Sequence, residues 1–515
     1  MAVVLVASLL CAGCGGFIGV STPDTPTPDE GPQTTVGTGD RTDPDTDVLG
    51  WEGGVWHNES IAVDQSDGLS DAELARYVAR GMARVEYIRD LEFKSMVPVE
   101  VMSRAEYRNR SQGGGSNGPS TYQRWNEQVW EALWILGENA TFAEALGATR
   151  GSSVAGFYSP SKDRITIITP TPESPTISSG TLIHELTHAI QDQYGYLGRS
   201  SLVRSTQDGQ LAADSLVEGE ANYVQDRYGM RCGGAWNCVA SPSEGSGGSL
   251  PPDFNFGVFV TIFFPYSDGP PWVASRVDTA GWQAISAAYD SPPVSTEQVI
   301  HVTNETPMTL SFTDTSTDAW SMYPNYGERG ADTVGEASIF TMFWYQSRNY
   351  DAGVVPVNAL GDTESPYDAY RYVSSPSEGW GNDLVVPYRN GSGGDGYVWK
   401  TIWDTEADAR EFARAYRAVL AAHDARSTGQ NTYVVPSGPF ADAFRVVREG
   451  QRVTIVNAPT VEALADLRPN VSAPGTPTRT TRATSGATGP GLGIGTVVVA
   501  AVVTALLLGA RAHRD

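Results

Sequence analysis

Hydrophobic positions along this chain follow two different periods, and together they predict both helices and strands. In residues 181–194 the apolar side chains recur three and four positions apart, which is the spacing of one helix face. These side chains are Leu182, Ile183, Leu186, Ala189 and Ile190. Ser178 or Ser179 would cap the start of this helix, and Gly195 would end it. Directly upstream, residues 164–169 are rich in β-branched side chains and predict a strand.

Similar patterns predict further elements of both kinds. Ser70 and Glu73 form a capping-box sequence that opens a helix reaching about Leu91. Further helices are predicted at residues 124–147, 211–228, 334–346 and 404–422. Further strands are predicted at residues 97–101, 384–387 and 453–456, and Pro98 would confine the first of them to a sheet edge. The sequence therefore predicts an α+β fold. Glu336 within the third helix would be paired in the core rather than line a cleft.

The composition changes at both ends of the chain. Residues 1–14 form an apolar run that ends in Ala12-Gly13-Cys14, which resembles a lipoprotein signal with Cys14 as the lipidated residue. A plain signal peptide or an uncleaved anchor is the alternative, since no lysine or arginine precedes the run. Residues 15–49 and 469–490 are spacers rich in Thr and Pro that cannot bury enough apolar surface to fold. Within the last segment, 491–515, the apolar run Ile494 to Ala510 and the arginines after it predict a short transmembrane helix.

Charge and cysteine content indicate the compartment in which the middle of the chain functions. The net charge of −25, with only three lysines, resembles that of halophilic proteins and offers no basic stripe for nucleic acid. Cys232 and Cys238 bracket a short loop and predict a disulfide, which suits an oxidising exterior; a second metal site is the competing interpretation. Six N-glycosylation sequons fit the same extracellular location: Asn58, Asn109, Asn139, Asn304, Asn390 and Asn470.

The strongest chemical signal is the sequence His184-Glu185-Leu186-Thr187-His188. Positions i and i+4 share one face of a helix, so both imidazoles can bind one zinc ion. Glu185 lies beside the first ligand and would act as the catalytic base on a metal-coordinated water. The alternative is a surface helix with two solvated histidines.

A catalytic zinc site needs a third protein ligand and leaves its fourth position to water. Glu218, in the predicted helix 211–228, is our choice for that ligand, and Glu220 is the fallback. Asp214 and Asn222 lie about one turn either side of Glu218, where they could orient a histidine through its second ring nitrogen. An ordinary solvated glutamate is the alternative for Glu218.

These residues resemble a known family. The segment 184–193, followed by 216–221, is similar to the gluzincin pattern of HExxH with a downstream glutamate, and more closely to haloarchaeal cell-surface proteins with HELTHAxQDQ and EGxA motifs. Residues 399–409 also resemble that family, as does the start of the C-terminal tail at Pro490-Gly491, although Leu492 stands where its PGF sorting motif has Phe. The resemblance implies that the tail is cut and replaced by a lipid anchor, and a simple C-terminal transmembrane anchor is the alternative. The resemblance implies a zincin-like catalytic domain at 50–330 and a further α+β part at 331–468.

The leading hypothesis is therefore a zinc-dependent endopeptidase on the outer face of the cell membrane, acting on a peptide or protein. The C-terminal helix, and a lipid on Cys14, would anchor it. Tyr223, Tyr228 and His301 are candidate donors to the oxyanion. The alternative from another class is a non-catalytic surface or adhesive protein with a structural or vestigial zinc site. A soluble intracellular enzyme is a distant third, because both chain ends oppose it.

Overall fold

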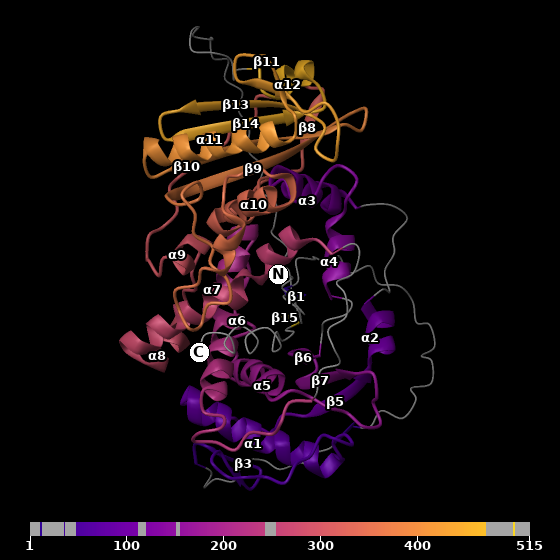
Figure 1. Cartoon of the computed structure of the whole chain (residues 1–515), viewed down its shortest axis with the longest axis vertical. Coiled ribbons are helices and arrows are strands. Elements are labelled where there is room, and N and C mark those ends of the chain that lie inside the picture. Colours follow the sequence, from indigo (N-terminus) through magenta and orange to yellow (C-terminus); the bar gives the residue numbers. More distant parts are fainter. Residues whose placement is uncertain are drawn as a thin grey trace.

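The computed structural model describes residues 48–111, 120–150, 155–242 and 254–469, together with two-residue strands at β1 (Cys11–Ala12), β2 (Thr35–Val36) and β15 (Val498–Val499). This part is a mixed α+β fold. A four-stranded sheet lies toward one end of the long axis and a seven-stranded sheet at the other, with long helices between them (Figure 1). The predicted signal, the spacers and the C-terminal membrane helix fall almost wholly outside the described residues. Within those residues, no helix has both the length and the apolarity needed to cross a membrane.

The four-stranded sheet has the order β2-β5-β7-β6. Helices α1 (Asp71–Arg89) and α5 (Ser179–Gln193) pack against it. Strands β5 (Val99–Ser103) and β7 (Arg164–Thr169) are parallel, and β6 (Gly156–Ser159) runs antiparallel to β7 at the end of the order. Helix α1 packs on α5 through Gly81, where a Cβ would lie 2.7 Å from a Leu186 methyl group. This close approach of α1 buries the helix that carries the HExxH sequence.

Most of the helix caps and helix ends predicted for this part of the chain are confirmed. Ser70 and Glu73 form the predicted capping box, and Ser178 caps α5 through the Thr181 N–H. Helix α1 ends two residues earlier than expected, because Asp90 adopts a positive φ. The edge position predicted for the strand at 97–101 is wrong. Pro98 lies just before β5, where it interrupts no ladder, and β5 pairs on both sides.

The single helix predicted at residues 124–147 is wrong, because two helices occupy this stretch. They are α3 (Thr121–Ala132) and α4 (Phe142–Arg150). Between them Trp134 has a φ of 54°, and Gly137 lies against Pro439, whose carbonyl accepts the Glu138 N–H. Contact with a distant part of the chain thus stops a helix that local propensity would have continued.

Helices α6 (Gln207–Gly229) and α7 (Phe256–Ala280) form the longest helix pair. They approach each other through Gly219 and Gly269: a Cβ on Gly219 would lie 2.5 Å from the Gly269 carbonyl carbon. By propensity alone, glycine is an unfavourable residue inside a helix. A glycine is needed at position 219 for a steric reason, since a larger residue would keep the α7 backbone from coming this close.

We expect Gly219→Ala to destabilise the protein, although alanine is the better helix former. A methyl group there meets the α7 backbone, and overpacking of this kind costs about 1–3 kcal/mol, against a propensity gain of at most about 1 kcal/mol. Chemical denaturation would measure the change in the free energy of unfolding. Gly229→Ala is the matched control, because a Cβ at Gly229 meets no atom within 4 Å. Equal stability of the two variants would refute this explanation of Gly219.

The seven-stranded antiparallel sheet has the order β11-β12-β13-β14-β10-β9-β8. Helix α11 (Glu406–Ala422), which starts at a Thr405 capping box, packs Phe412 against Trp399 and Trp403, whereas α12 (Val461–Leu467) packs Leu464 in a second cluster with Val456. The strands are β8 (Trp320–Met322), β9 (Trp380–Asn390), β10 (Asp395–Trp403), β11 (Arg426–Gly429), β12 (Thr432–Val434), β13 (Ala443–Glu449) and β14 (Arg452–Ala458).

The smaller elements connect these layers. They are the hairpin β3 (Trp51–Glu52) and β4 (Val55–Trp56), and the helices α2 (Arg104–Ser111), α8 (Trp282–Ala288), α9 (Thr296–Ile300) and α10 (Gly335–Tyr350). Two short 3₁₀ turns lie at Ser200–Leu202 and Val357–Gly361.

Buried carboxylates fix the seven-stranded sheet to the central helices. Asp383 on β9 accepts the N–H groups of Val334 and Gly335 at the start of α10. Asp332 accepts the Gln207 N–H at the start of α6, at 2.8 Å. One continuous hydrophobic core also extends from β7 through α10 to β10. The C-terminal part thus holds the N-terminus of the helix that carries Glu218.

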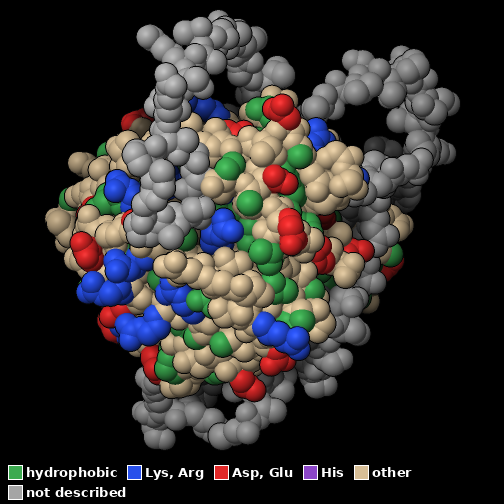
Figure 2. All heavy atoms as spheres, turned by 90° about the horizontal axis from the view of Figure 1, so that it is seen from above, with side chains coloured by type: hydrophobic (Ala, Val, Ile, Leu, Met, Phe, Trp, Pro, Cys, Tyr) green, Lys and Arg blue, Asp and Glu red, His purple; other side chains and the backbone are tan. Residues whose placement is uncertain are grey.

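The outer end of the seven-stranded sheet carries both acidic and basic side chains. Viewed end-on, lysine and arginine side chains gather on one side of this face, among acidic, apolar and small polar groups (Figure 2). The chain as a whole has 60 acidic and 35 basic side chains.

Candidate metal centre

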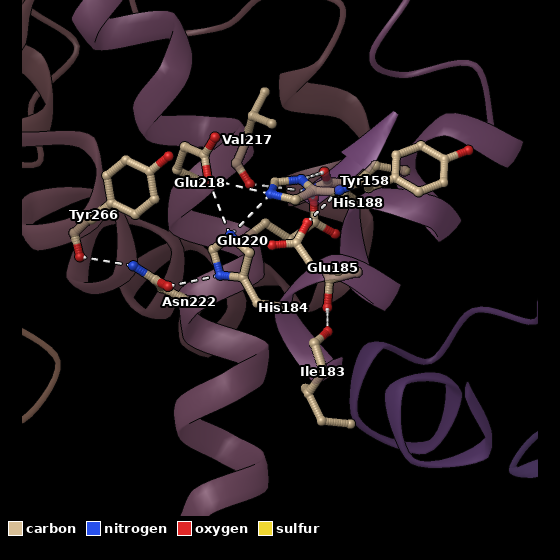
Figure 3. A network of polar contacts seen from close by, with 12 residues as sticks. Tyr158, Ile183, His184, Glu185, His188, Val217, Glu218, Glu220, Asn222 and Tyr266 are labelled. Atoms are coloured by element: carbon tan, nitrogen blue, oxygen red, sulfur yellow. Dashed lines mark hydrogen bonds and ion pairs between the residues drawn. The ribbon is translucent and has the colours of Figure 1, made fainter. Parts of the chain in front are cut away.

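Three buried side chains from two helices converge on one point. His184 and His188 project from α5, one turn apart, and Glu218 projects from α6 (Figure 3). The two Nε2 atoms lie 3.0 Å apart, and each is 3.3 Å from Glu218 Oε2. The histidines are fully buried and Glu218 is 4% exposed. Among the described residues, this is the metal-compatible group whose members are all buried.

The spacing of these three atoms suits a tetrahedral metal ion. Zinc binds nitrogen and oxygen at about 2.0–2.1 Å, so two ligands of a tetrahedron lie about 3.3 Å apart. The observed separations of 3.0 to 3.3 Å agree with this value. A larger ion such as Ca²⁺, with ligands at about 2.3–2.6 Å and a preference for oxygen, fits neither the spacing nor the imidazoles.

The second ring nitrogens fix which atoms face the centre. His184 Nδ1 lies 2.9 Å from Asn222 Oδ1, and His188 Nδ1 lies 2.8 Å from Gln191 Oε1. Asn222 Nδ2 also donates to the Tyr266 carbonyl, which orients its amide. Both imidazoles therefore donate through Nδ1 and direct the Nε2 lone pairs at the centre. Two lone pairs and a carboxylate oxygen facing one another require a positive charge between them.

The ionisation of the cluster supports the same requirement. Burial opposes the charged form of Glu218, but the neighbouring His188 holds the pKa of this carboxyl at about 2. Desolvation likewise opposes a charged His188, yet Glu218 raises the pKa of that imidazole to about 9. A proton therefore occupies the centre when no metal is bound, and a metal ion would displace it.

Glu185 lies beside this cluster but does not belong to it. Its Oε2 accepts the Tyr158 N–H of β6 at 2.7 Å, whereas its Oε1 is buried and has no hydrogen-bond partner. Burial raises the pKa of the Glu185 carboxyl to about 8. A buried carboxylate oxygen without a partner is costly, so it marks a position where a ligand or a water molecule would be stabilising.

The other candidate residues on α6 have separate roles. Asn222 contacts His184, as expected for an orienting residue. Asp214 instead accepts from Gln210, one turn earlier, and no contact with an imidazole places it in the cluster. Glu220, the fallback ligand, is turned away: it pairs with Arg89 and accepts from Tyr289 and Gln191. Two residues along a helix is over half a turn, so Glu218 and Glu220 face different sides.

None of the three expected oxyanion donors lies at the cluster. Tyr223 packs against Trp282 and Tyr367, and the Tyr228 hydroxyl accepts from Arg84. His301 pairs with Glu336 at 2.9 Å, which also confirms that Glu336 is a paired, buried carboxylate rather than a free one.

Sequence reasoning missed two residues that contact the cluster. Gln191 lies three positions after His188 on the same helix, a spacing that could have identified it. Tyr266 on α7 stacks parallel to His184, with ring centroids 6.2 Å apart, and lies beside Glu218 (Figure 3). Burial, and then the Glu218 charge, raise the pKa of the Tyr266 phenol well above its usual range, so it remains a donor. Nothing in the local sequence around Tyr266 indicated this position.

Two other groups of residues were candidates for metal binding or covalent linkage. Cys232 and Cys238 form a disulfide, which excludes the competing metal interpretation for these thiols. Glu131, Glu138 and Asp442 also lie close together, but Glu138 is exposed and the group contains carboxylates alone. Cys14, the expected lipidation site, lies outside the described residues.

Comparison with known proteins adds one match. Residues 321–468 match a family model described as "Domain of unknown function (DUF8575)". This range contains the seven-stranded sheet and α10, and none of the cluster residues. No curated protein and no solved structure matches the chain. The candidate metal centre therefore rests on its own geometry.

Proposed function

We propose that this protein is a zinc-dependent endopeptidase with a zincin-like catalytic domain. The observation that carries the proposal is the position of Glu185: one oxygen is held by β6, and the other is buried without a partner beside three side chains that could hold a metal ion. A purely structural zinc site has four protein ligands and no use for such a carboxylate. The adhesive alternative leaves this free oxygen without an explanation.

The chemistry assigned to each residue follows from its place. His184, His188 and Glu218 would hold zinc, which when bound supplies Lewis-acid chemistry and lowers the pKa of a coordinated water to about 7. Glu185 Oε1 would be placed to accept a proton from a water that attacks a peptide carbonyl. The same carboxyl then delivers the proton to the leaving amine.

Strand β6 offers a place for an extended peptide. Ala155 hydrogen-bonds toward β7, so Tyr158, whose N–H points to Glu185, and Gly156, two residues earlier, direct their backbone groups away from β7. The Tyr158 N–H is already bonded to Glu185, so a peptide added as a further strand would pair with the Tyr158 carbonyl and with Gly156. The substrate class we assign is accordingly an unfolded segment of a peptide or protein.

We propose that the protein is located on the outer face of the cell membrane. The Cys232–Cys238 disulfide supports an oxidising compartment, and the expected anchors are the C-terminal apolar run and a lipid on Cys14. The test of the function as a whole is hydrolysis of an unfolded protein by the purified full chain. Activity that a chelator removes and added zinc restores is expected. Zinc binding without hydrolysis of any unfolded substrate would favour the adhesive alternative.

Tyr266→Phe should lower kcat by about 10²–10³-fold, the usual cost of losing one oxyanion donor. The Tyr266 hydroxyl is the buried donor beside Glu218, and the substitution keeps the ring that stacks on His184. KM and zinc content should stay near the wild-type values. Tyr223→Phe is the matched control, since Tyr223 lies away from the cluster. A kcat unchanged in Tyr266→Phe would remove Tyr266 from the mechanism.

A further inference from the structure

His188 is the first member of a buried chain of polar contacts that connects three helices and the segment after a fourth. It starts at His188 and Gln191 on α5 and continues to Glu220 on α6. From Glu220 it divides to Arg89, the last residue of α1, and to Tyr289, which follows α8. Arg89 and Glu220 are each 1% exposed in their side chains. Burying the polar groups of this chain costs desolvation free energy, which a functional role would explain.

The first link determines the tautomer of His188. The Gln191 Nε2 group donates to the Val217 carbonyl and to Glu220 Oε2, both at 3.0 Å. A carbonyl and a carboxylate only accept, so the amide nitrogen must face them and Oε1 must face His188. His188 then carries its proton on Nδ1 and directs a lone pair from Nε2 to the metal. A reversed Gln191 amide would require the opposite tautomer, which cannot bind through Nε2.

The second link keeps Glu220 an acceptor. The Arg89 guanidinium, which has donors only, pairs with Glu220 Oε1. Tyr289 donates to the same oxygen that accepts from Gln191. Both Glu220 oxygens thus receive a donor from elsewhere, and Glu220 faces Gln191 as an acceptor. Donor and acceptor roles are thus fixed at each link, from the Arg89 guanidinium through Glu220 and Gln191 to His188.

We propose that Gln191, Glu220, Arg89 and Tyr289 form a positioning chain that locks His188 in its metal-binding tautomer. This inference rests on the proposed zinc site, which it deepens. It also gives Glu220, the alternative ligand by sequence, a role in the second layer. The chain links the metal to α1 and to the segment after α8, neither of which supplies a ligand.

The most direct variant is Gln191→Met, which keeps the shape of the side chain and removes its hydrogen bonds. We expect its zinc affinity, measured by competition with a chelator, to fall by about 10–100-fold, as for other second-layer residues. Tyr289→Phe removes one of three donors to Glu220 and should cause a smaller loss. The matched controls are Gln193→Met on the same helix, and Tyr196→Phe, whose ring stacks on Tyr289. Both controls should bind zinc as the wild type does.

A second readout separates this inference from the proposed function. In the metal-free full chain at alkaline pH, where imidazoles are neutral, ¹⁵N shifts of labelled histidine should show the Nδ1–H tautomer of His188 in the wild type. Gln191→Met should show a mixture. Failure of the wild type to bind zinc would refute the proposed function, while these tautomer results would still uphold the chain. Equal zinc affinity and an equal tautomer population in Gln191→Met and the wild type would overturn it.

Discussion

Replacing Glu185 by Gln should leave zinc bound and lower kcat for peptide hydrolysis by about 10²–10⁴-fold, which is the contribution of a general base. The amide keeps the size of the side chain, and its oxygen can still accept the Tyr158 N–H. It cannot take a proton from water. The side chain contributes no atom to the His184, His188 and Glu218 cluster, so the metal should remain. Zinc content by atomic absorption and steady-state kinetics would be measured on the same preparation.

The matched control for that variant is Asp192→Asn. Asp192 lies on the same helix and contacts the Tyr158 hydroxyl rather than its backbone N–H. It should retain both zinc and activity. Full activity in Glu185→Gln would exclude Glu185 as the base, whatever the zinc content.

Replacing Glu218 by Gln should lower zinc affinity by more than the roughly 100-fold upper effect of a second-layer residue. The neutral amide removes the one negative charge among the three ligands, and it leaves His188 without the carboxylate that raises its pKa. Peptidase activity at limiting zinc should be lost. The thermal stabilisation that zinc gives the wild type should also disappear, because a ligand stabilises a fold only as far as it binds.

Asp214→Asn provides the comparison on the same helix. Asp214 lies one turn before Glu218 and bonds to Gln210, so the variant should bind zinc normally. If Asp214→Asn and Glu218→Gln lost zinc equally, the third ligand would have been assigned to the wrong carboxylate.

Much of the local structure around the centre was predictable, because it depends on short-range patterns. Ser178 caps α5 as its position in the sequence indicates, and the four-residue spacing of His184 and His188 places both rings on one face. The i+4 spacing also related Asn222 to Glu218. These relations act within one helix, so a single sequence contains them.

The features that sequence reasoning missed depend on contacts between distant segments. Helix α7 contains Pro265, Pro270 and Pro271, which by propensity argue against a helix, yet it is buried against α6 at Gly219. That packing brings Tyr266 beside His184 and Glu218 of the candidate metal centre. The break between α3 and α4 likewise depends on Pro439, some 300 residues away. No local pattern reports either contact.

The choice between Glu218 and Glu220 shows the same limit at closer range. Both are buried glutamates of α6, and the sequence could rank them but not separate them. What separates them is Arg89 from α1, which pairs with Glu220 and leaves Glu218 to face the histidines.

The central claim is that zinc binds through three protein ligands and keeps a fourth position for water. X-ray absorption of the zinc-loaded full chain tests it most directly. We predict four light-atom neighbours at about 2.0–2.1 Å, two of them imidazoles, with one oxygen neighbour displaced by an added hydroxamate. In Glu218→Gln the same spectrum should be weaker or lost. A sphere of four protein ligands that hydroxamate leaves unchanged would contradict the claim and would indicate a structural site.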